Sequence, residues 1–249
     1  KPKIPYFAWR NYGRCIKKVF AVHKKMPIMP EINQIYCADA LVFLKKLSDK
    51  SVDLVLTDPP YGINIARTGK VGGAGKNFIG KMVNSRQYTP SDWDNKPPPK
   101  KVFDEIFRVS KNQIIFGGNH FNEWLKQGNK WIVWDKKATG NFSKCELIWT
   151  SFKGAIDKFD WEWNGFIQGN GRGGRQRVQR EHPSQKPIEL MAYLIKKFSS
   201  QDDLILDPFL GSGSSVVAAK FLKRNYLGVE ISPEYIKIAE KRLAQEILI

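Results

Sequence analysis

LILDPFLGSGSSVVAAKFL, residues 204–222, is the stretch that decides the fold. It begins with three aliphatic residues and Asp207, a pattern typical of a buried strand that ends at a sheet edge. A turn with Gly211 and Gly213 follows, and residues 215–222 have a helix-like composition. Glycines in such a turn let the backbone approach a ligand closely, and the helix N-terminus then faces that ligand. The stretch therefore predicts the first half of a nucleotide-binding crevice.

A second strand is expected over residues 226–230, and it ends in Glu230. This acid follows the glycine turn by about 20 residues, the spacing expected for a carboxylate that binds ribose hydroxyls. A lone Gly-x-Gly more often marks an ordinary turn, but Asp207 before it and Glu230 after it favour a ribose-containing ligand. The turn lacks a third glycine at Val216, which disfavours a dinucleotide oxidoreductase.

Another apolar run, VDLVLT at residues 52–57, stops at Asp58-Pro59-Pro60-Tyr61. Two prolines cannot continue a central strand, so the run predicts a buried strand that ends at the edge where α/β sheets bind ligands. The tetrad offers a carboxylate, backbone carbonyls and an aromatic face, which suit a planar ring with an exocyclic amino group. Asp-Pro-Pro also forms ordinary turns, so the tetrad alone leaves both interpretations open.

A third motif, HPSQKP at residues 182–187, lies upstream of the strand that starts at Leu204. One interpretation is a proline-bracketed loop that leads into a helix over residues 188–198. The other places Ser184 and Lys186 beside the crevice, where they would hold a small carboxylate. The motif alone favours neither.

The remaining chain alternates strand-like and helix-like stretches, which predicts one α/β domain with a mainly parallel sheet and helices on both faces. Further strands are expected at residues 34–37, 113–116, 131–134 and 146–151, and helices from Asp39 to Leu47, at 100–109 and at 119–126.

Together the motifs resemble those of the DNA amino-methyltransferases that use S-adenosylmethionine, in their β-class order. In that class Asp-Pro-Pro-Tyr comes first, a target-recognition segment follows, and His-Pro-Ser/Thr-Gln-Lys-Pro and Phe-x-Gly-x-Gly come last. The resemblance covers residues 31–249 and includes residues 117–120 and 131–136. It implies a Rossmann-like methyltransferase fold with a circularly permuted motif order. Glutamine and many RNA methyltransferases carry their tetrad after the glycine loop, so the order disfavours them.

The resemblance also implies a mechanism, namely direct in-line transfer of the methyl group to the amino group of a flipped base, with no metal and no covalent intermediate. The catalytic residues would be Asp58, Pro59, Pro60 and Tyr61: Asp58 and the Pro59 carbonyl would accept the amino hydrogens, and Tyr61 would stack on the base. Asp39 is expected at the cofactor adenine, Glu230 at the ribose, Asp207 along the methionine part, and Ser184 and Lys186 near its carboxylate. The full implied set of cofactor-binding residues is Asp39, Ala40, His182, Ser184, Lys186, Asp207, Phe209, Gly211, Ser212, Gly213 and Glu230.

Adenine N6 is the favoured target, because the Asp form of the tetrad is more typical of adenine enzymes in the family and a Ser form of cytosine N4 enzymes. Cytosine N4 is the first alternative and structured RNA a more distant one. An inactive DNA-binding subunit with the same fold is the alternative from a different class. The intact set of Asp58, Tyr61, Gly211, Gly213 and Glu230 argues against that subunit.

Composition agrees with a nucleic-acid partner. The formal net charge is +17 over 249 residues, which suits a polyanion such as double-stranded DNA. No apolar run is long enough to span a bilayer, so no membrane association is expected. Three widely spaced cysteines predict reduced thiols in a cytoplasmic protein, without a disulfide framework or a metal site.

Three segments stand apart from the regular pattern. Residues 1–30 form a basic extension with no acid before Glu31, which suits a DNA-contacting arm, a targeting peptide, a solvated extension or non-native sequence ahead of Met26. Residues 62–99 hold six glycines and are expected to close over a flipped base. The resemblance implies that residues 152–181 hold a short target-recognition segment, whose Arg and Gln side chains can contact base edges, and a flexible solvated loop is the alternative. The expected DNA contacts are Arg172, Arg175, Gln176, Arg177 and Arg180.

A homodimer and a cognate restriction endonuclease are further partners that the family resemblance implies.

Overall fold

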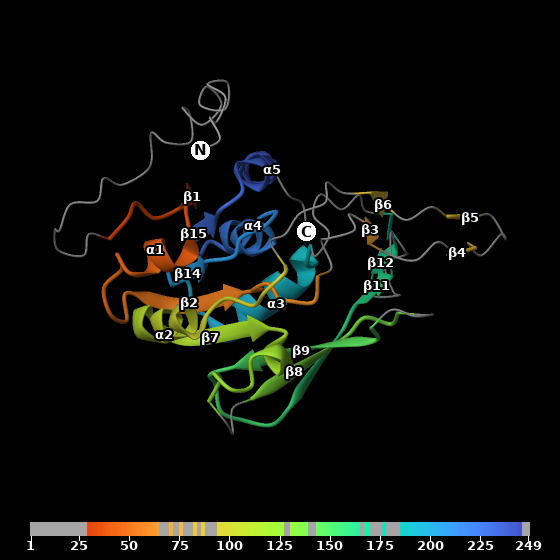
Figure 1. Cartoon of the computed structure of the whole chain (residues 1–249), viewed down its shortest axis with the longest axis horizontal. Helices are drawn as coiled ribbons and strands as arrows, with labels where there is room; N and C mark the ends of the chain where they lie inside the picture. Colours follow the sequence, from red (N-terminus) through yellow and green to blue (C-terminus); the bar gives the residue numbers. More distant parts are fainter. Residues whose placement is uncertain are drawn as a thin grey trace, which may run out of the picture.

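The computed structural model describes the chain in eleven stretches, which leave out residues 1–28 and several loops (Figure 1). The described residues are 29–64, 70–71, 75–76, 82–83, 86–87, 94–126, 130–138, 143–164, 167–169, 176–177 and 185–245. The predictions for residues 1–30 and much of 62–99 therefore lie outside the described residues. None of the described helices has the length and apolar character needed to cross a bilayer.

The core of the fold is an eight-stranded sheet with the order β1-β15-β14-β2-β7-β9-β8-β10. Its strands are β1 (Gln34–Cys37), β2 (Val52–Thr57), β7 (Ser110–Phe116), β8 (Trp131–Asp135), β9 (Cys145–Thr150), β10 (Asp157–Asp160), β14 (Leu204–Asp207) and β15 (Asn225–Glu230). The pairs from β1 through β7 are parallel, as is β8 with β10, whereas β9 runs antiparallel to both β7 and β8. Figure 1 shows β8 and β9 at one end of the sheet and β1 at the other.

Helices cover both faces of the main sheet. They are α1 (Ala40–Leu44), α2 (Lys100–Val109), α3 (Ile188–Phe198), α4 (Ser214–Phe221) and α5 (Pro233–Ala244). On one face Leu54 and Leu56 of β2 belong to a core with α3, α4 and α5, and on the other face Val55 packs with α1 and α2. Because both faces are buried, β2 is apolar along most of its length rather than alternating. The predicted α/β fold with a mainly parallel sheet is confirmed.

Smaller strands lie outside the main sheet. β3 (Lys70–Val71) pairs with β6 (Arg86–Gln87), and β4 (Gly75–Lys76) pairs with β5 (Met82–Val83). β11 (Glu162–Asn164), β12 (Ile167–Gly169) and β13 (Gln176–Arg177) form a three-stranded antiparallel sheet. The expected recognition segment, residues 152–181, therefore contributes β10 to the main sheet before this small sheet begins.

The helix expected over residues 119–126 is wrong. The structure has a single turn of 3-10 helix, η3 (Gly118–His120), followed by turns. Phe121, Trp124 and Leu125 have the spacing of a helical apolar face, but they pack with Phe103 in a cluster of their own. The turn starts at Gly117, whose φ of 61° is outside the helical region. Packing of this short turn therefore outweighs the helical periodicity.

Candidate active site

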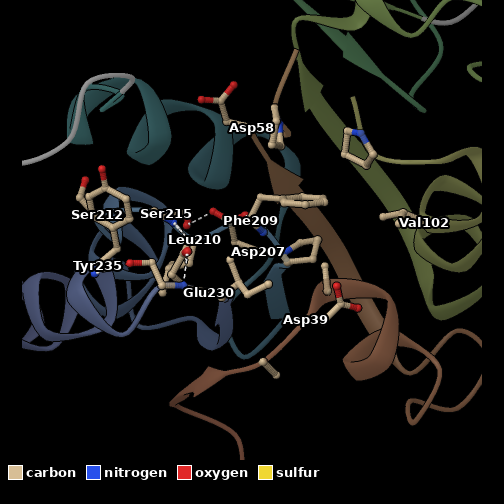
Figure 2. Close-up of a pocket in the computed structure, with 18 of the residues that line it drawn as sticks. Asp39, Asp58, Val102, Asp207, Phe209, Leu210, Ser212, Ser215, Glu230 and Tyr235 are labelled. Carbon is tan, nitrogen blue, oxygen red and sulfur yellow. Dashed lines mark hydrogen bonds between the residues drawn. The ribbon is translucent and has the colours of Figure 1, made fainter. Parts of the chain in front are cut away.

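A pocket of about 570 Å³ lies where β1, β2, β14 and β15 end (Figure 2). Each strand delivers one acidic side chain to its wall, and these are Asp39, Asp58, Asp207 and Glu230. The volume is in the usual range for a small-molecule site, roughly 300–1,000 Å³. The carboxyl edge of a parallel sheet is also where α/β proteins bind ligands. The structure therefore brings together four acids that lie far apart in the sequence.

Asp207, at the end of β14, is buried and accepts three hydrogen bonds. Thr57 Oγ1 donates to its Oδ1 at 2.7 Å, the Phe209 amide donates to the same atom at 3.1 Å, and Ser215 Oγ donates to Oδ2 at 2.5 Å. Burial raises the pKa of Asp207 to about 6, although these three hydrogen bonds oppose the shift. The carboxyl group thus holds the end of β2, the glycine loop and the start of α4 together.

The stability of the ligand-free protein is expected to depend on pH through Asp207. Its folded pKa, about 6, is above the ordinary value of 3.8, so the folded state keeps a proton that the unfolded state loses between these values. Stability therefore falls as pH rises from about 4 to about 6, by about 3 kcal/mol for this group, and is constant above. An Asp207→Asn variant lacks this dependence. In thermal unfolding, Tm of the variant minus Tm of the wild type should increase up to about pH 6 and then level off; two parallel Tm curves would contradict the assignment.

Glu230 and the glycine loop form one unit. The Gly211 amide donates to Glu230 Oε2 and the Ser232 amide to Oε1, both at 2.8 Å. Burial raises the pKa of Glu230, and the backbone hydrogen bonds oppose the rise. Gly213 has a φ of 85°, and a Cβ there would lie 2.8 Å from the Cβ of Ala239. The loop needs glycine at this position because α5 packs directly against it.

The remaining pocket wall is largely apolar. Asp39 begins α1, where its Oδ1 accepts the Val42 amide at 2.9 Å, and Ala40 and Phe209 line the wall beside it. The residues Pro97, Pro98 and Pro99 also line the pocket, just ahead of α2. Their run of three was visible in the sequence, but no local pattern shows which wall a proline run will form.

Two residues of the tetrad, Asp58 and Tyr61, belong to a cluster of polar and charged groups. The sequence predicted only some members of this cluster. Tyr61 Oη is 2.6 Å from Asp58 Oδ1 and 2.6 Å from Glu146 Oε1. The ammonium group of Lys186 contacts Asp58 Oδ2 and is 3.2 Å from Glu146 Oε1. Lys136 completes the cluster, 2.8 Å from Glu146 Oε2. We refer to Asp58, Tyr61, Lys136, Glu146 and Lys186 as the tetrad cluster.

Glu146 was missed because its place depends on the direction of β9. An antiparallel strand begins at the edge where its parallel neighbours end, and Glu146 is the second residue of β9. The register pairs it with Trp134, one residue from the end of β8, which brings Lys136 close. The expected role of Lys186, holding a ligand carboxylate, stays a prediction; its ammonium is paired here with two carboxylates of the chain.

The Tyr61 ring is held in place from several directions. His120 stacks on it with ring centroids 4.7 Å apart and an interplanar angle of 12°, and Phe121 contacts its edge. Gly117 lies so close that a Cβ would be 2.3 Å from one ring carbon. The turn over residues 117–120 therefore fixes the aromatic face of the tetrad.

A Gly117→Ala change is expected to lower the rate of the proposed reaction about tenfold, because a small misplacement of a positioning group is enough to cost that much. The new Cβ would meet three Tyr61 ring atoms within 2.9 Å, and the φ of 61° is strained for alanine. Ligand affinity should stay within about twofold, since Gly117 does not line the pocket. Gly154→Ala is the matched control, because Gly154 is also at positive φ but a Cβ there would make only an ordinary contact, 3.8 Å from the Lys130 side chain. Equal rates for both variants would show that Tyr61 tolerates displacement.

Some expected site residues have no described side chain. His182 and Ser184 lie outside the described residues, as do Arg172, Arg175 and Arg180. Gln176 and Arg177 form β13, for which the structure gives the backbone pairing with β12. Their expected contacts with the cofactor and with DNA stay predictions.

Comparison with known proteins shows which family the sequence matches. A family model described as DNA methylase, for the N6 and N4 type, matches residues 75–241. The type II methyltransferase M2.LlaDCHI of Lactococcus lactis subsp. cremoris is 36% identical over 249 residues, covering 83% of this chain and 87% of that protein.

Two solved structures share the fold. The cytosine-N4-specific PvuII DNA methyltransferase matches with a TM-score of 0.56 at 14% identity, over 91% of each chain. The S-adenosylmethionine complex of M1.HpyAVI matches with a TM-score of 0.50 at 23% identity, over 85% of this chain and 99% of that one.

Proposed function

The chain belongs to the N6 and N4 family of DNA methylases, and from this we propose that it transfers the methyl group of S-adenosylmethionine to the exocyclic N6 amino group of adenine in DNA. The observation that carries the proposal is the place of Asp58, which lines the pocket and also belongs to the tetrad cluster. Asp58 can therefore reach both a ligand in the pocket and a base that stacks on Tyr61.

The pocket fits S-adenosylmethionine by the chemistry of its wall. Glu230 presents a carboxylate where ribose hydroxyls would donate, and Asp207 presents one toward the cationic methionine part. The apolar surface of Phe209 and of the prolines suits an adenine ring, beside the carboxylate of Asp39. When bound, S-adenosylmethionine supplies a sulfonium methyl group as the electrophile.

Asp58 and Pro59 prepare the amino group for attack. A base in duplex DNA hides this group, so the nucleotide must be extruded into the site, as other base-modifying enzymes do. Hydrogen bonds from the amino N–H groups to the Asp58 carboxylate and the Pro59 carbonyl localise the nitrogen lone pair and stabilise the positive charge that develops on nitrogen. Holding nitrogen and methyl carbon in line supplies much of the remaining rate.

Tyr61 gives the extruded base its stacking surface, which offsets part of the unstacking cost, about 1–3 kcal/mol. One face of this ring already stacks on His120. A base therefore stacks on the face that His120 leaves open or displaces the imidazole.

DNA is the partner that the charge supports. The net charge of +17 attracts phosphates, and the arginines of residues 172–180 are our candidates for base contacts. The type II name of M2.LlaDCHI supports a place beside a cognate restriction endonuclease. We keep a homodimer as a further proposal from the family resemblance.

The target base is tested by incubating the protein with S-adenosylmethionine and DNA from a methylation-free host, then identifying the nucleosides by mass spectrometry. N6-methyladenine is the expected product. N4-methylcytosine would keep the mechanism but reverse the base assignment, since both bases offer the same amino geometry. No methylated base together with no S-adenosylmethionine binding would favour an inactive DNA-binding subunit.

A further inference from the structure

The Tyr61 hydroxyl lies between two carboxyl groups, although it has only one proton to donate. Its oxygen is 2.6 Å from an oxygen of Asp58 and 2.6 Å from an oxygen of Glu146. Burial and the two neighbouring acids raise the pKa of Tyr61 well above 10, so the phenol keeps its proton. It can therefore donate to one acid only, and a second contact this short requires a proton on the other carboxyl group.

The charges around the two acids indicate which one carries that proton. Burial, opposed by Lys186 and reinforced by Glu146, raises the pKa of Asp58. Burial acts the same way on Glu146, but the ammonium groups of Lys186 and Lys136 outweigh it and lower the pKa of Glu146. The resting arrangement is then a protonated Asp58 that donates to Tyr61, while Tyr61 donates to Glu146. The Lys186 ammonium donates to the second oxygen of Asp58.

Building on the proposed methyl transfer, we propose that Glu146 is a positioning residue of the reaction. It holds the Tyr61 hydroxyl and the Lys186 ammonium against Asp58, and it sets the charge of Asp58. Asp58 accepts the substrate N–H best when ionised, so the protonated resting form must release its proton to solvent through the pocket, which Asp58 lines, before transfer. Glu146 does not line the pocket, and it acts on Asp58 through Tyr61 and Lys186.

The groups that face Asp58 come from four parts of the fold. Tyr61 follows it in the tetrad, Glu146 comes from β9, Lys186 precedes α3 and Asp207 ends β14. Lys136 lies one step further, against Glu146. Glu146 and Lys186 bear opposite charges, so removing each one has an opposite effect on the ionisation of Asp58. A merely structural role would not produce opposite effects.

The test is the pH profile of kcat in the Glu146→Gln variant, measured as methyl transfer to DNA between about pH 5 and pH 9. Without the negative charge Asp58 ionises more easily, so the acidic limb should move to lower pH by on the order of one unit. At the plateau kcat should fall about tenfold because a neutral amide holds the Tyr61 hydroxyl and the Lys186 ammonium less strongly than a carboxylate does, while KM for S-adenosylmethionine changes less than about twofold. Lys186→Gln should move the acidic limb to higher pH.

Asp157→Asn is the matched control. Asp157 of β10 also joins a tyrosine hydroxyl and two lysines: Tyr193 Oη lies 3.2 Å away, Lys130 Nζ 3.6 Å away, and Lys197 is in contact. This cluster is outside the pocket. The control variant should keep the wild-type pH profile.

Lys186 is buried, so circular dichroism must show whether the Lys186→Gln variant folds. A second comparison does not depend on that variant. Tyr61→Phe removes one of the two groups through which Glu146 acts, so adding Glu146→Gln to it should lower the plateau kcat by less than about threefold, a smaller effect than in the wild type. The positioning role of Glu146 would be overturned if Glu146→Gln kept the wild-type pH profile of kcat, or if the acidic limb moved in the same direction in Glu146→Gln and Lys186→Gln. Either result would leave the proposed function standing. A wild-type protein that transfers no methyl group at any pH would overturn the proposed function and this inference with it.

Discussion

An Asp58→Ala variant is expected to transfer methyl groups about 1,000-fold more slowly than the wild type, the upper range for losing one group that stabilises transition-state charge. Alanine cannot accept the amino N–H, so the lone pair stays delocalised in the ring and the charge on nitrogen goes unbalanced. The variant also removes one of the two carboxylates that contact Lys186 and leaves it beside Glu146. The loss should appear in kcat under single-turnover conditions with saturating S-adenosylmethionine.

Asp53→Ala is the control for this variant. Asp53 belongs to the same strand, β2, but lies near its other end, where it pairs with Lys111 at 2.6 Å and accepts the Leu204 amide. Its rate should stay within about twofold of the wild type. Calorimetry should show that Asp58→Ala still binds S-adenosylmethionine. A rate within tenfold of the wild type would remove Asp58 from the chemistry.

A Glu230→Ala variant is expected to bind S-adenosylmethionine about 100-fold more weakly. Each hydrogen bond from a ligand hydroxyl to a charged group contributes about 1.5–3 kcal/mol. Alanine also leaves the Gly211 and Ser232 amides without the carboxylate they share, which loosens the glycine loop. The effect should fall on Kd, with a smaller change in kcat once the cofactor saturates.

Glu240→Ala removes the same charge from the exposed side of α5, outside the pocket, and should leave Kd unchanged. Titration calorimetry at matched ionic strength compares the two variants. An unchanged Kd for Glu230→Ala would contradict the role of Glu230 in ribose binding and move the ribose site to another part of the pocket.

The elements that the sequence predicted best are those bounded by prolines. β2 spans Val52–Thr57 as expected because it is buried on both faces and stops at two prolines. The helices α2 and α3 also have the expected bounds, since Pro99 and Pro187 precede their first residues. Burial and proline geometry are local properties, so a single sequence carries them.

The features that escaped prediction depend on contacts between distant segments. The direction of β9 is not encoded in its own residues, yet that direction delivers Glu146 to the tetrad. Phe121 and Trp124 mimic a helical face and pack instead as a compact aromatic cluster. Asp58, Asp207 and Glu230 could be predicted as site residues because each lies at the end of a strand that is recognisable in the sequence. The charges that surround Asp58 could be found only from the fold.

The most direct test of the account is transfer of tritium from methyl-labelled S-adenosylmethionine to acid-precipitated DNA from a methylation-free host. The wild-type chain and Asp58→Ala are compared under identical conditions. We expect label in the DNA with the wild type and background label with the variant. Equal label with both proteins would contradict the assignment of Asp58, and background label with both, from folded protein that binds the cofactor, would contradict DNA as the substrate.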